Sequence, residues 1–355
     1  MTPAPARRRN LTQRDVARAA GVSTAVVSAV LSPKANSSIR VAPDTAERVH
    51  EVVRRLGYVP NLVARSLAGG ERKLVGVFTY EPVFPSDRAN FFYPFLLGIE
   101  RGVERAGYDL LLYTSSGGSG AGRKIYPDGA NRLRLADGAI LFGQEPDKGE
   151  LTRLAAEGFP FVTIGRREIA SGQISYVAAD YARATEEMVA HCAATGHSRI
   201  AYIGEADARE QHVDRERGYW RGLAAAGLVQ RHDWLWRIDP AALRDAAFRA
   251  RLEALRAEGV TAILTESAAQ ADAVEAALAA RGLSVPADLS IGVLAAPMED
   301  RPEFKRWTRI RIPREEMGET AVAALLDVLA GRAASPVQRV LPCTLVPSET
   351  VRAPI

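Results

Sequence analysis

The sequence predicts two folded parts: a small all-α module at the N-terminus and a larger α/β module built on doubly wound parallel sheets. The chain has 355 residues, which exceeds one average domain. Residues 1–73 hold 13 Arg or Lys and 5 Asp or Glu, whereas the remainder holds 33 and 37. From residue 73 onward, short apolar runs alternate with amphipathic helical patterns, as parallel sheets require. A small basic module therefore precedes a larger, mildly acidic one, and the basic module is expected to meet a polyanion.

Composition narrows the class of protein. Hydrophobic residues make up 47% and charged residues 25% of the chain, so both a core and a solvated surface are available. No apolar run reaches the roughly 18 residues of a membrane span. Arg7, Arg8 and Arg9 are not followed by the apolar segment of a secretory signal. The two cysteines, Cys192 and Cys343, fit a reducing compartment, and we expect a cytoplasmic protein.

The first elements are two short helices joined by a glycine turn. Thr12 is a good N-cap for a helix whose apolar positions are 16, 17 and 20, and Gly21 ends it in a left-handed turn. Ser23 then caps a second helix with valines at 26, 27 and 30. This arrangement is a helix-turn-helix, which places its second helix in the DNA major groove.

A third helix and a short linker complete the basic module. Pro43 and Asp44 favour a helix start, valines and a leucine share one face up to residue 56, and Gly57 stops it. Pro60-Asn61 begins another short helical stretch, which ends at Gly69-Gly70. The module is thus long enough to close a small helical core of its own.

Three motifs in this region resemble the LacI/GalR family of transcription regulators. They are D-V-A-x-x-A-G-V-S at 15–23, V-x-x-x-T-x-E-R-V at 41–49 and L-G-Y-x-P-N-x-x-A-R-S-L at 56–67. Their order and spacing within about 55 residues make coincidence improbable. The resemblance implies a DNA-binding domain at 1–60, a hinge helix and linker at 61–72, and an effector-binding and dimerisation domain at 73–355.

The resemblance also implies which residues meet DNA. In the family, the hinge leucine, here Leu67, wedges into the minor groove with Ala64 beside it. Thr24 and Ser28 suit base contacts, Ala25 suits a thymine methyl, and Ser23 and Thr45 suit phosphates. Ala29 replaces a frequent arginine, so the operator of better-known members cannot be carried over. The predicted DNA-contacting residues are Thr12, Ser23, Thr24, Ala25, Ser28, Ala29, Thr45, Tyr58, Asn61, Ala64 and Leu67.

The larger module reads as alternating strands and helices. Predicted strands are KLVGVFTY (73–80), DLLLYTS (109–115), DGAILFG (137–143), FVTIGR (161–166), RIAYIGE (199–205), TAILTES (261–267) and LSIGVLAA (289–296). Predicted helices include 95–108, 182–195, 217–226, 248–258 and 268–281. The pattern resembles the two-lobed periplasmic-binding-protein-like domain of the family, in which ligands sit between lobes at strand carboxyl ends.

The effector site is expected between those lobes. The resemblance points to Phe92, Tyr93, Arg166, Asp180 and Arg215. Three acidic positions that sugar-binding relatives use are occupied here by Gly165, Glu266-Ser267-Ala268 and Leu294-Ala295-Ala296. Guanidinium groups that lack partners are costly to bury, so an anionic metabolite or a modified sugar is favoured as the effector.

Alternatives remain open at this point. A neutral sugar could be held by Glu266, Gln144 and Asp180, the pocket could be degenerate, or the chain could be a solute-binding sensor that does not bind DNA. No nucleophile elbow, metal-ligand spacing or phosphate-loop motif is present, so we expect no enzyme activity, cofactor or metal. The chain has no leucine heptads after Pro347, which favours a homodimer over a tetramer.

Overall fold

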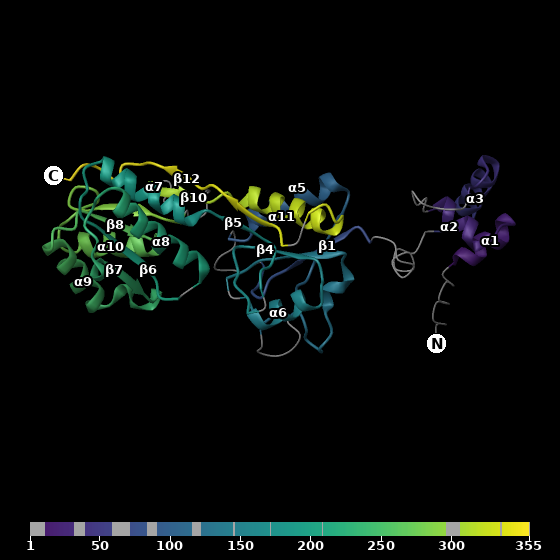
Figure 1. Ribbon diagram of the computed structural model, residues 1–355, viewed down its shortest axis with the longest axis horizontal. Helices are drawn as coiled ribbons and strands as arrows, with labels where there is room; N and C mark the ends of the chain where they lie inside the picture. The colour runs from purple at the N-terminus through teal and green to yellow at the C-terminus, as the bar shows by residue number, and fades with distance from the viewer. Residues whose placement is uncertain are drawn as a thin grey trace, which may run out of the picture. The chain divides into compact units, whose positions relative to one another are not determined.

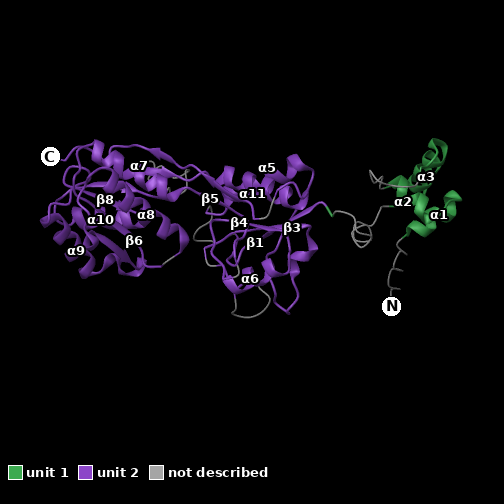
Figure 2. Cartoon of the chain, in the orientation of Figure 1, with its two compact units in different colours: residues 1–72 green, residues 73–355 purple. Residues whose placement is uncertain are grey.

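The structure is a computed structural model that describes residues 11–31, 40–58, 72–83, 91–115, 122–144, 146–170, 172–207, 209–295, 306–333 and 336–354. Two compact units, Met1–Arg72 and Lys73–Ile355, divide the chain (Figure 2). The first is helical and the second is α/β, so the predicted fold class is confirmed. The predicted hinge helix, with Asn61, Ala64 and Leu67, lies outside the described residues.

The helical unit contains α1 (Gln13–Ala20), α2 (Thr24–Leu31) and α3 (Pro43–Leu56). Its core is formed mainly by valines that are fully or almost fully buried, with Val16, Val27 and Val49 at 0% exposure. Gly21 follows α1 with φ of 66°, a left-handed conformation that glycine adopts at little cost. The chain can therefore turn sharply between α1 and α2, as a helix-turn-helix requires.

The larger unit contains two lobes (Figure 1). Lobe 1 is a six-stranded parallel sheet in the order β11-β5-β4-β3-β1-β2. Its strands are β1 (Leu74–Phe78), β2 (Asp109–Leu112), β3 (Gly138–Leu141), β4 (Phe161–Ile164), β5 (Tyr176–Ala179) and β11 (Gln338–Leu341). Its helices are α5 (Tyr93–Ala106), α6 (Lys148–Ala156) and α11 (Arg314–Leu329), with the short 3-10 helix η1 (Arg132–Leu135).

Lobe 2 is a second six-stranded sheet in the order β12-β10-β9-β8-β6-β7, parallel except where β12 runs antiparallel to β10. Its strands are β6 (Ile200–Glu205), β7 (Leu235–Ile238), β8 (Ala262–Thr265), β9 (Ser290–Val293), β10 (Thr308–Arg311) and β12 (Thr344–Val346). Its helices are α7 (Tyr181–Ala194), α8 (Glu210–Ala225), α9 (Ala246–Ala257) and α10 (Ala268–Ala279), with η2 (His232–Trp234) and η3 (Pro240–Arg244).

The chain passes between the lobes three times: after β5, after β10 and after β11. The third passage places β12 in lobe 2 although β11 belongs to lobe 1. Each sheet is therefore completed by strands that come from distant parts of the sequence. The carboxyl ends of the strands border the space between lobes, which is where parallel α/β folds bind ligands.

Two helix pairs pack closely because a glycine lies at each contact. A Cβ on Gly98 of α5 would lie 2.0 Å from the carbonyl oxygen of Glu315 in α11. A Cβ on Gly218 of α8 would lie 2.1 Å from the carbonyl oxygen of Ala182 in α7. Both distances are far below van der Waals contact, so these positions admit only glycine at the present helix separation.

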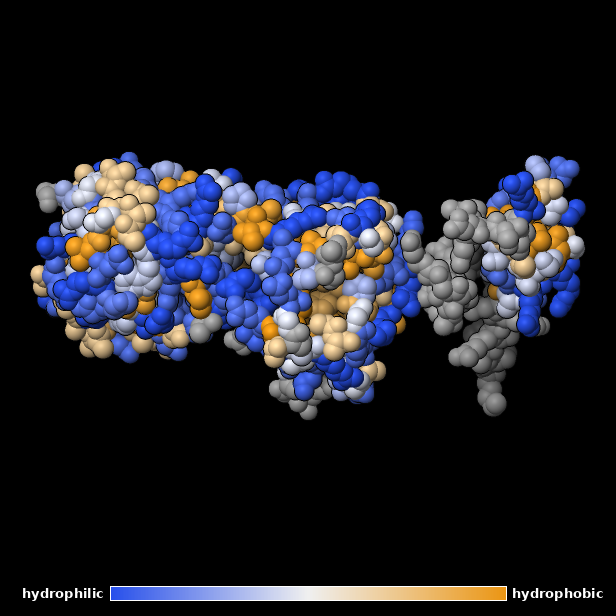
Figure 3. All heavy atoms as spheres, viewed as in Figure 1, coloured by the Kyte–Doolittle hydropathy of each residue, from blue (hydrophilic) through white to orange (hydrophobic). Residues whose placement is uncertain are grey.

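The face of the molecule in Figure 3 is mainly hydrophilic, and apolar residues form smaller patches on it. Among the described residues, no helix is both long enough and apolar enough to cross a membrane. Apolar side chains are instead concentrated in the interior of each lobe.

Candidate effector-binding site

A cavity of about 560 Å³ lies between the lobes of the larger unit. Residues that follow β3 and β4 border it from lobe 1, and residues that follow β6, β8 and β9 border it from lobe 2. Its size falls in the range of sites for small organic molecules. Two kinds of side chain share the wall: a group of apolar residues and a group of arginines.

The apolar part of the wall is aromatic. Phe91, Phe95 and Phe142 line the cavity, and Phe95 and Phe142 have ring centroids 6.1 Å apart. Met317 and Ile312 add aliphatic surface beside them. Such a surface favours the hydrocarbon part of a ligand, either an alkyl or aromatic group or the C–H face of a sugar ring.

Three of the arginines that line the cavity are already held by polar partners. Arg166 of lobe 1 donates to both carboxylate oxygens of Asp214 in lobe 2, at 3.2 and 2.8 Å. Arg167 donates to the carbonyl oxygens of Gly143 and Arg166. Arg209 pairs with Asp207 and also donates to Gln144 Oε1 at 3.1 Å. The Arg166–Asp214 and Arg209–Gln144 contacts join the two lobes.

Arg215 differs from these three arginines. It is 5% exposed, and it lines the cavity from α8. Its guanidinium lies over the Tyr181 ring, 4.5 Å from the centroid, and its Nη1 is 3.7 Å from Glu266 Oε2. None of its N–H groups donates a hydrogen bond within the described part of the chain, and its Nε is buried without a partner. A buried cation with unused donors is costly unless another group supplies acceptors.

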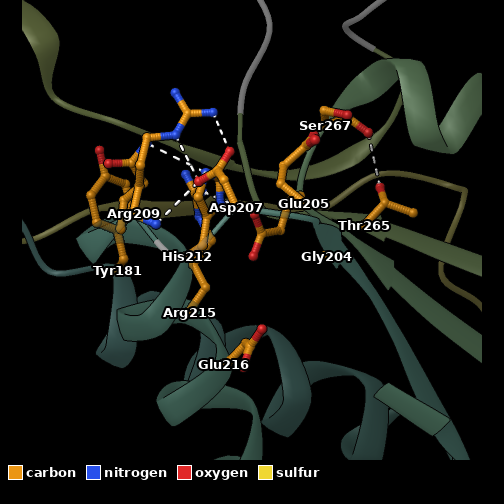
Figure 4. Close-up of polar contacts among 12 residues, drawn as sticks. Tyr181, Gly204, Glu205, Asp207, Arg209, His212, Arg215, Glu216, Thr265 and Ser267 are labelled. Atoms are coloured by element: carbon orange, nitrogen blue, oxygen red, sulfur yellow. Dashed lines mark hydrogen bonds and ion pairs between the residues drawn. The ribbon is translucent and has the colours of Figure 1, made fainter. Parts of the chain in front are cut away.

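A polar cluster lies behind Arg215 in lobe 2. Glu266, which is 2% exposed, accepts a hydrogen bond from the hydroxyl of Tyr202 and is hydrogen-bonded to Nδ1 of His212. Burial alone raises the pKa of Glu266, but the hydrogen bond with His212 and the charge of Arg215 outweigh it, and the pKa is lowered. Figure 4 shows His212 and Arg215 at this end of the cavity, with Arg209 and Asp207 joined by dashed lines.

The carboxyl of Glu205, which lines the cavity, has a pKa shifted in the opposite direction to that of Glu266. Burial and the nearby charge of Glu266 raise the pKa of Glu205 above its ordinary value. Glu205 accepts a hydrogen bond from Gln270 Nε2 at 3.3 Å. Among the described residues, no group of His, Cys, Asp and Glu is arranged to hold a metal ion.

The structure brings together three of the seven residues predicted for the effector site, namely Gln144, Arg166 and Arg215. The other four do not line the cavity. Phe92 is buried in the core of lobe 1, Tyr93 is 57% exposed at the start of α5, and Asp180 caps α7 by accepting from the backbone N of Arg183. Glu266 lies directly behind the wall, bonded to His212.

Two predictions about the charged residues of the effector site are therefore corrected. Arg166 was predicted to need an anionic ligand, but Asp214 and Glu168 already accept hydrogen bonds from its guanidinium. A neutral sugar was considered to be held by Glu266 and Asp180, but neither carboxylate lines the cavity. Arg215 alone of the two predicted arginines keeps unused donors within the described chain.

Several wall residues were missed by the sequence reading. Phe95 lies on α5, whereas Phe91 precedes the helix, so helical periodicity does not relate the two. His212 and Asp214 are polar, so they do not contribute to an apolar pattern. Tyr181 and Arg314 lie where the chain passes between the lobes, and no local sequence pattern predicts that such positions line a cavity.

Within the helical unit, Thr24, Ala25 and Ser28 are exposed on α2, as a reading helix requires. Thr12 and Ser23 cap helices: Thr12 donates to Asp15, and Ser23 Oγ accepts from the Val26 backbone N at 3.3 Å. Ala29 and Thr45 are half-buried. Tyr58 is 7% exposed and belongs to the helical core, so its burial favours packing over the predicted DNA contact.

Comparison with known families gives two matches. The model of bacterial regulatory proteins of the lacI family matches residues 12–61. The model of the periplasmic binding protein-like domain matches residues 189–351. The first match covers the helical unit and the second covers most of lobe 2 and the return of the chain through lobe 1.

Individual proteins are similar over most of the chain. The HTH-type transcriptional regulator CelR of Thermobifida fusca is 30% identical over 97% of this chain and 99% of its own length. Catabolite control protein A of Priestia megaterium is 31% identical over 79% of this chain and 81% of its own.

Solved structures share the fold. A complex of the transcriptional regulator CelR with cellobiose has a TM-score of 0.62 at 25% identity, covering 96% of this chain and 99% of its own. The lac repressor dimer bound to operator and the anti-inducer ONPF has a TM-score of 0.68 at 23% identity, covering 97% and 100%. The similarity covers both units, so these structures contain a counterpart of the helical unit as well as of the unit that holds the cavity.

Proposed function

Since the chain belongs to the lacI family of bacterial regulatory proteins, we propose that it controls transcription by binding an operator as a homodimer, under the control of an acidic small molecule bound at Arg215. The family consists of transcriptional regulators, and we propose a binding function with no catalysis in the cavity. A DNA partner also implies a cytoplasmic location. The lac repressor structure, a dimer on operator, supports the proposed assembly.

For DNA recognition, we propose that α2 enters the major groove. Thr24, Ala25 and Ser28 are exposed on it, and all three are short. Short side chains reach base edges only at close approach, so phosphate contacts should supply much of the affinity. The proposed hinge contacts of Leu67 would supply specificity through deformation of the minor groove.

One observation carries the proposed effector class: the buried guanidinium of Arg215 makes no hydrogen bond within the described chain. A carboxylate or phosphate supplies several acceptors in the planar geometry that guanidinium matches. The aromatic wall at Phe91, Phe95 and Phe142 would hold the hydrocarbon part of the same molecule. Glu266 partly balances the charge of Arg215 but, at 3.7 Å, does not hydrogen-bond it.

A neutral sugar is the second candidate, because a solved structure that is 25% identical to this chain is a complex of the transcriptional regulator CelR with cellobiose. Cellobiose and cellobionate separate the two candidates, since they differ at the reducing end, where cellobionate has an open-chain carboxylate residue in place of the sugar ring. We expect cellobionate to raise the melting temperature of the full chain more than cellobiose does, because a ligand that binds only the folded state stabilises it by mass action.

The variant Arg215→Gln should remove this preference, and Arg221→Gln is its control. Arg221 also lies on α8 but pairs with Glu186 at an exposed position outside the cavity wall. Stabilisation of the native chain by cellobiose that equals or exceeds stabilisation by cellobionate would reject the acidic effector and favour the neutral sugar.

DNA binding is tested separately, by selection from randomised duplexes with the full chain. A pseudo-palindromic consensus is expected, because a two-fold protein binds a two-fold site. Affinity should fall steeply with salt as counterions are released. Recovery of no consensus, with equal affinity for any duplex, would contradict the proposed operator function.

A further inference from the structure

A buried three-residue cluster in lobe 2 joins the cavity wall to the interior. His212 of α8 is 6% exposed and lines the cavity, whereas Glu266 and Tyr202 lie behind it at 2% and 0%. Glu266 is bonded through Oε2 to Nδ1 of His212 and through Oε1 to the hydroxyl of Tyr202. Its backbone N donates to Gln270 Oε1 at 2.9 Å, and Gln270 Nε2 donates to the carbonyl oxygen of Gly204. The carboxylate is thus held from both sides.

The charge of Glu266 decides where the hydrogen of this cluster lies. The pKa of Glu266 is lowered, since its hydrogen bond with His212 and the charge of Arg215 outweigh its burial. An ionised carboxylate only accepts hydrogen bonds. Tyr202 must therefore donate its hydroxyl hydrogen, and Nδ1 of His212 must carry the ring hydrogen that points to Glu266.

The other ring nitrogen faces a different set of groups. Nε2 of His212 is 3.4 Å from Asp207 Oδ1 and 3.5 Å from Nε2 of Gln211, another residue of the cavity wall. Asp207 has its own cation, because Arg209 Nε donates to Oδ1 at 2.7 Å and Arg209 Nη2 pairs with Oδ2. Asp207 is therefore already paired with a cation other than His212.

We infer that Glu266 is a positioning residue that fixes His212 as the Nδ1–H tautomer and so presents Nε2 to the ligand as a hydrogen-bond acceptor. His212 and Arg215 are three residues apart on α8, so they are neighbours on one helix face. One offers an acceptor and the other offers donors. This pair fits a hydroxy acid, whose acidic group binds Arg215 and whose hydroxyl donates to His212. The inference rests on the proposed effector site and narrows its ligand class.

The tautomer is measured without any ligand. Long-range ¹H–¹⁵N spectra of the full chain labelled with ¹⁵N-histidine report which ring nitrogen carries hydrogen, and His212→Gln identifies the signal. At pH 8 we expect Nδ1 protonated and Nε2 unprotonated. A ring protonated at Nε2, alone or together with Nδ1, would overturn the inference.

The variant Glu266→Gln should reverse the tautomer. Tyr202 donates to the amide oxygen, which leaves the amide N–H₂ facing Nδ1 and forces the ring hydrogen to Nε2. Tyr202→Phe keeps the carboxylate and should retain the native tautomer. Glu253→Gln, at an exposed pair with Arg281 in lobe 2, is the matched control. If Glu266→Gln fails to fold, the native spectrum still decides the assignment.

Ligand choice is tested with two six-carbon acids. Gluconate carries hydroxyls and hexanoate carries none, so the native chain should bind gluconate at least tenfold more tightly by calorimetry. Glu266→Gln should lose that preference, whereas Arg215→Gln should weaken both acids. Equal preference in the native chain and Glu266→Gln would overturn the role of Glu266. Failure of both acids to bind the native chain would instead reject the acidic effector of the proposed function, while the spectra report on His212 independently.

Discussion

The pair Arg166–Asp214 should contribute measurable coupling between the lobes. Arg166 follows β4 in lobe 1, Asp214 lies on α8 in lobe 2, and two hydrogen bonds of 3.2 and 2.8 Å join them. Their side chains are 24% and 11% exposed. Hydrogen bonds to charged groups contribute about 1.5–3 kcal/mol each when buried. Solvent at Arg166 and the second bond from Arg217 to Asp214 reduce this value, so a coupling energy of about 1–2 kcal/mol is expected.

The coupling is measured by a double-mutant cycle of Arg166→Ala, Asp214→Ala and the double variant. Urea unfolding of the full chain, followed by tryptophan fluorescence, gives each free energy of unfolding. The control cycle uses Arg183 and Glu187, an i,i+4 pair whose side chains are 72% and 42% exposed, where about 0.3–0.5 kcal/mol is expected. A coupling for Arg166–Asp214 no larger than the control value would refute the idea that this pair holds the lobes together.

Three further predictions concern other parts of the chain. Leu67→Ala should weaken binding to a selected operator more than binding to random duplex, measured by fluorescence anisotropy, because a minor-groove wedge stabilises only deformed DNA; an equal loss on both would point to a packing role. Glu205→Gln should raise the free energy of unfolding at pH 7, since burial and Glu266 raise the pKa of Glu205 and its ionised form is disfavoured in the fold; this gain should disappear as pH falls below the raised pKa. Gly98→Ala should destabilise the chain by about 3 kcal/mol or more in urea, because its Cβ would meet the Glu315 carbonyl at 2.0 Å, and Gly102→Ala should cost less, because its Cβ meets the Val322 side chain at 2.9 Å.

Where a cap, a turn glycine or a run of apolar residues marks a helix or strand, the sequence was sufficient to predict that element. The turn at Gly21 and the cap at Ser23 were predicted, and α1 and α2 lie on either side of them. The predicted strands at 137–143 and 261–267 contain β3 and β8, whose residues are all buried. A strand buried on both faces reads as a continuous apolar run, which is recognisable without any partner.

The start of α8 could not be predicted in the same way. The sequence predicted a helix at 217–226, whereas α8 begins at Glu210. The inward face of the added turns carries Glu210, His212, Asp214 and Arg215, all buried and polar. Hydrophobic periodicity cannot predict that a polar helix face is buried, because charged side chains become buried only when partners from other parts of the fold neutralise them. Those partners, Arg166 and Glu266 among them, are more than 40 residues away in sequence.

The first turns of α8, which the sequence did not predict, also carry residues of the cavity wall. Asp214 and Arg215 are consecutive, but Asp214 binds lobe 1 through Arg166, whereas Arg215 lies over Tyr181 and lines the cavity. A rigid helix cannot shift one of these residues without moving the other. A ligand that draws Arg215 toward its acidic group therefore acts on the Arg166–Asp214 bridge as well, and any change in lobe spacing alters the position of Arg215. The proposed binding of an acid at Arg215 would therefore be coupled to the spacing of the lobes through one turn of helix, which is the physical requirement for an effector to bias the shape of the larger unit.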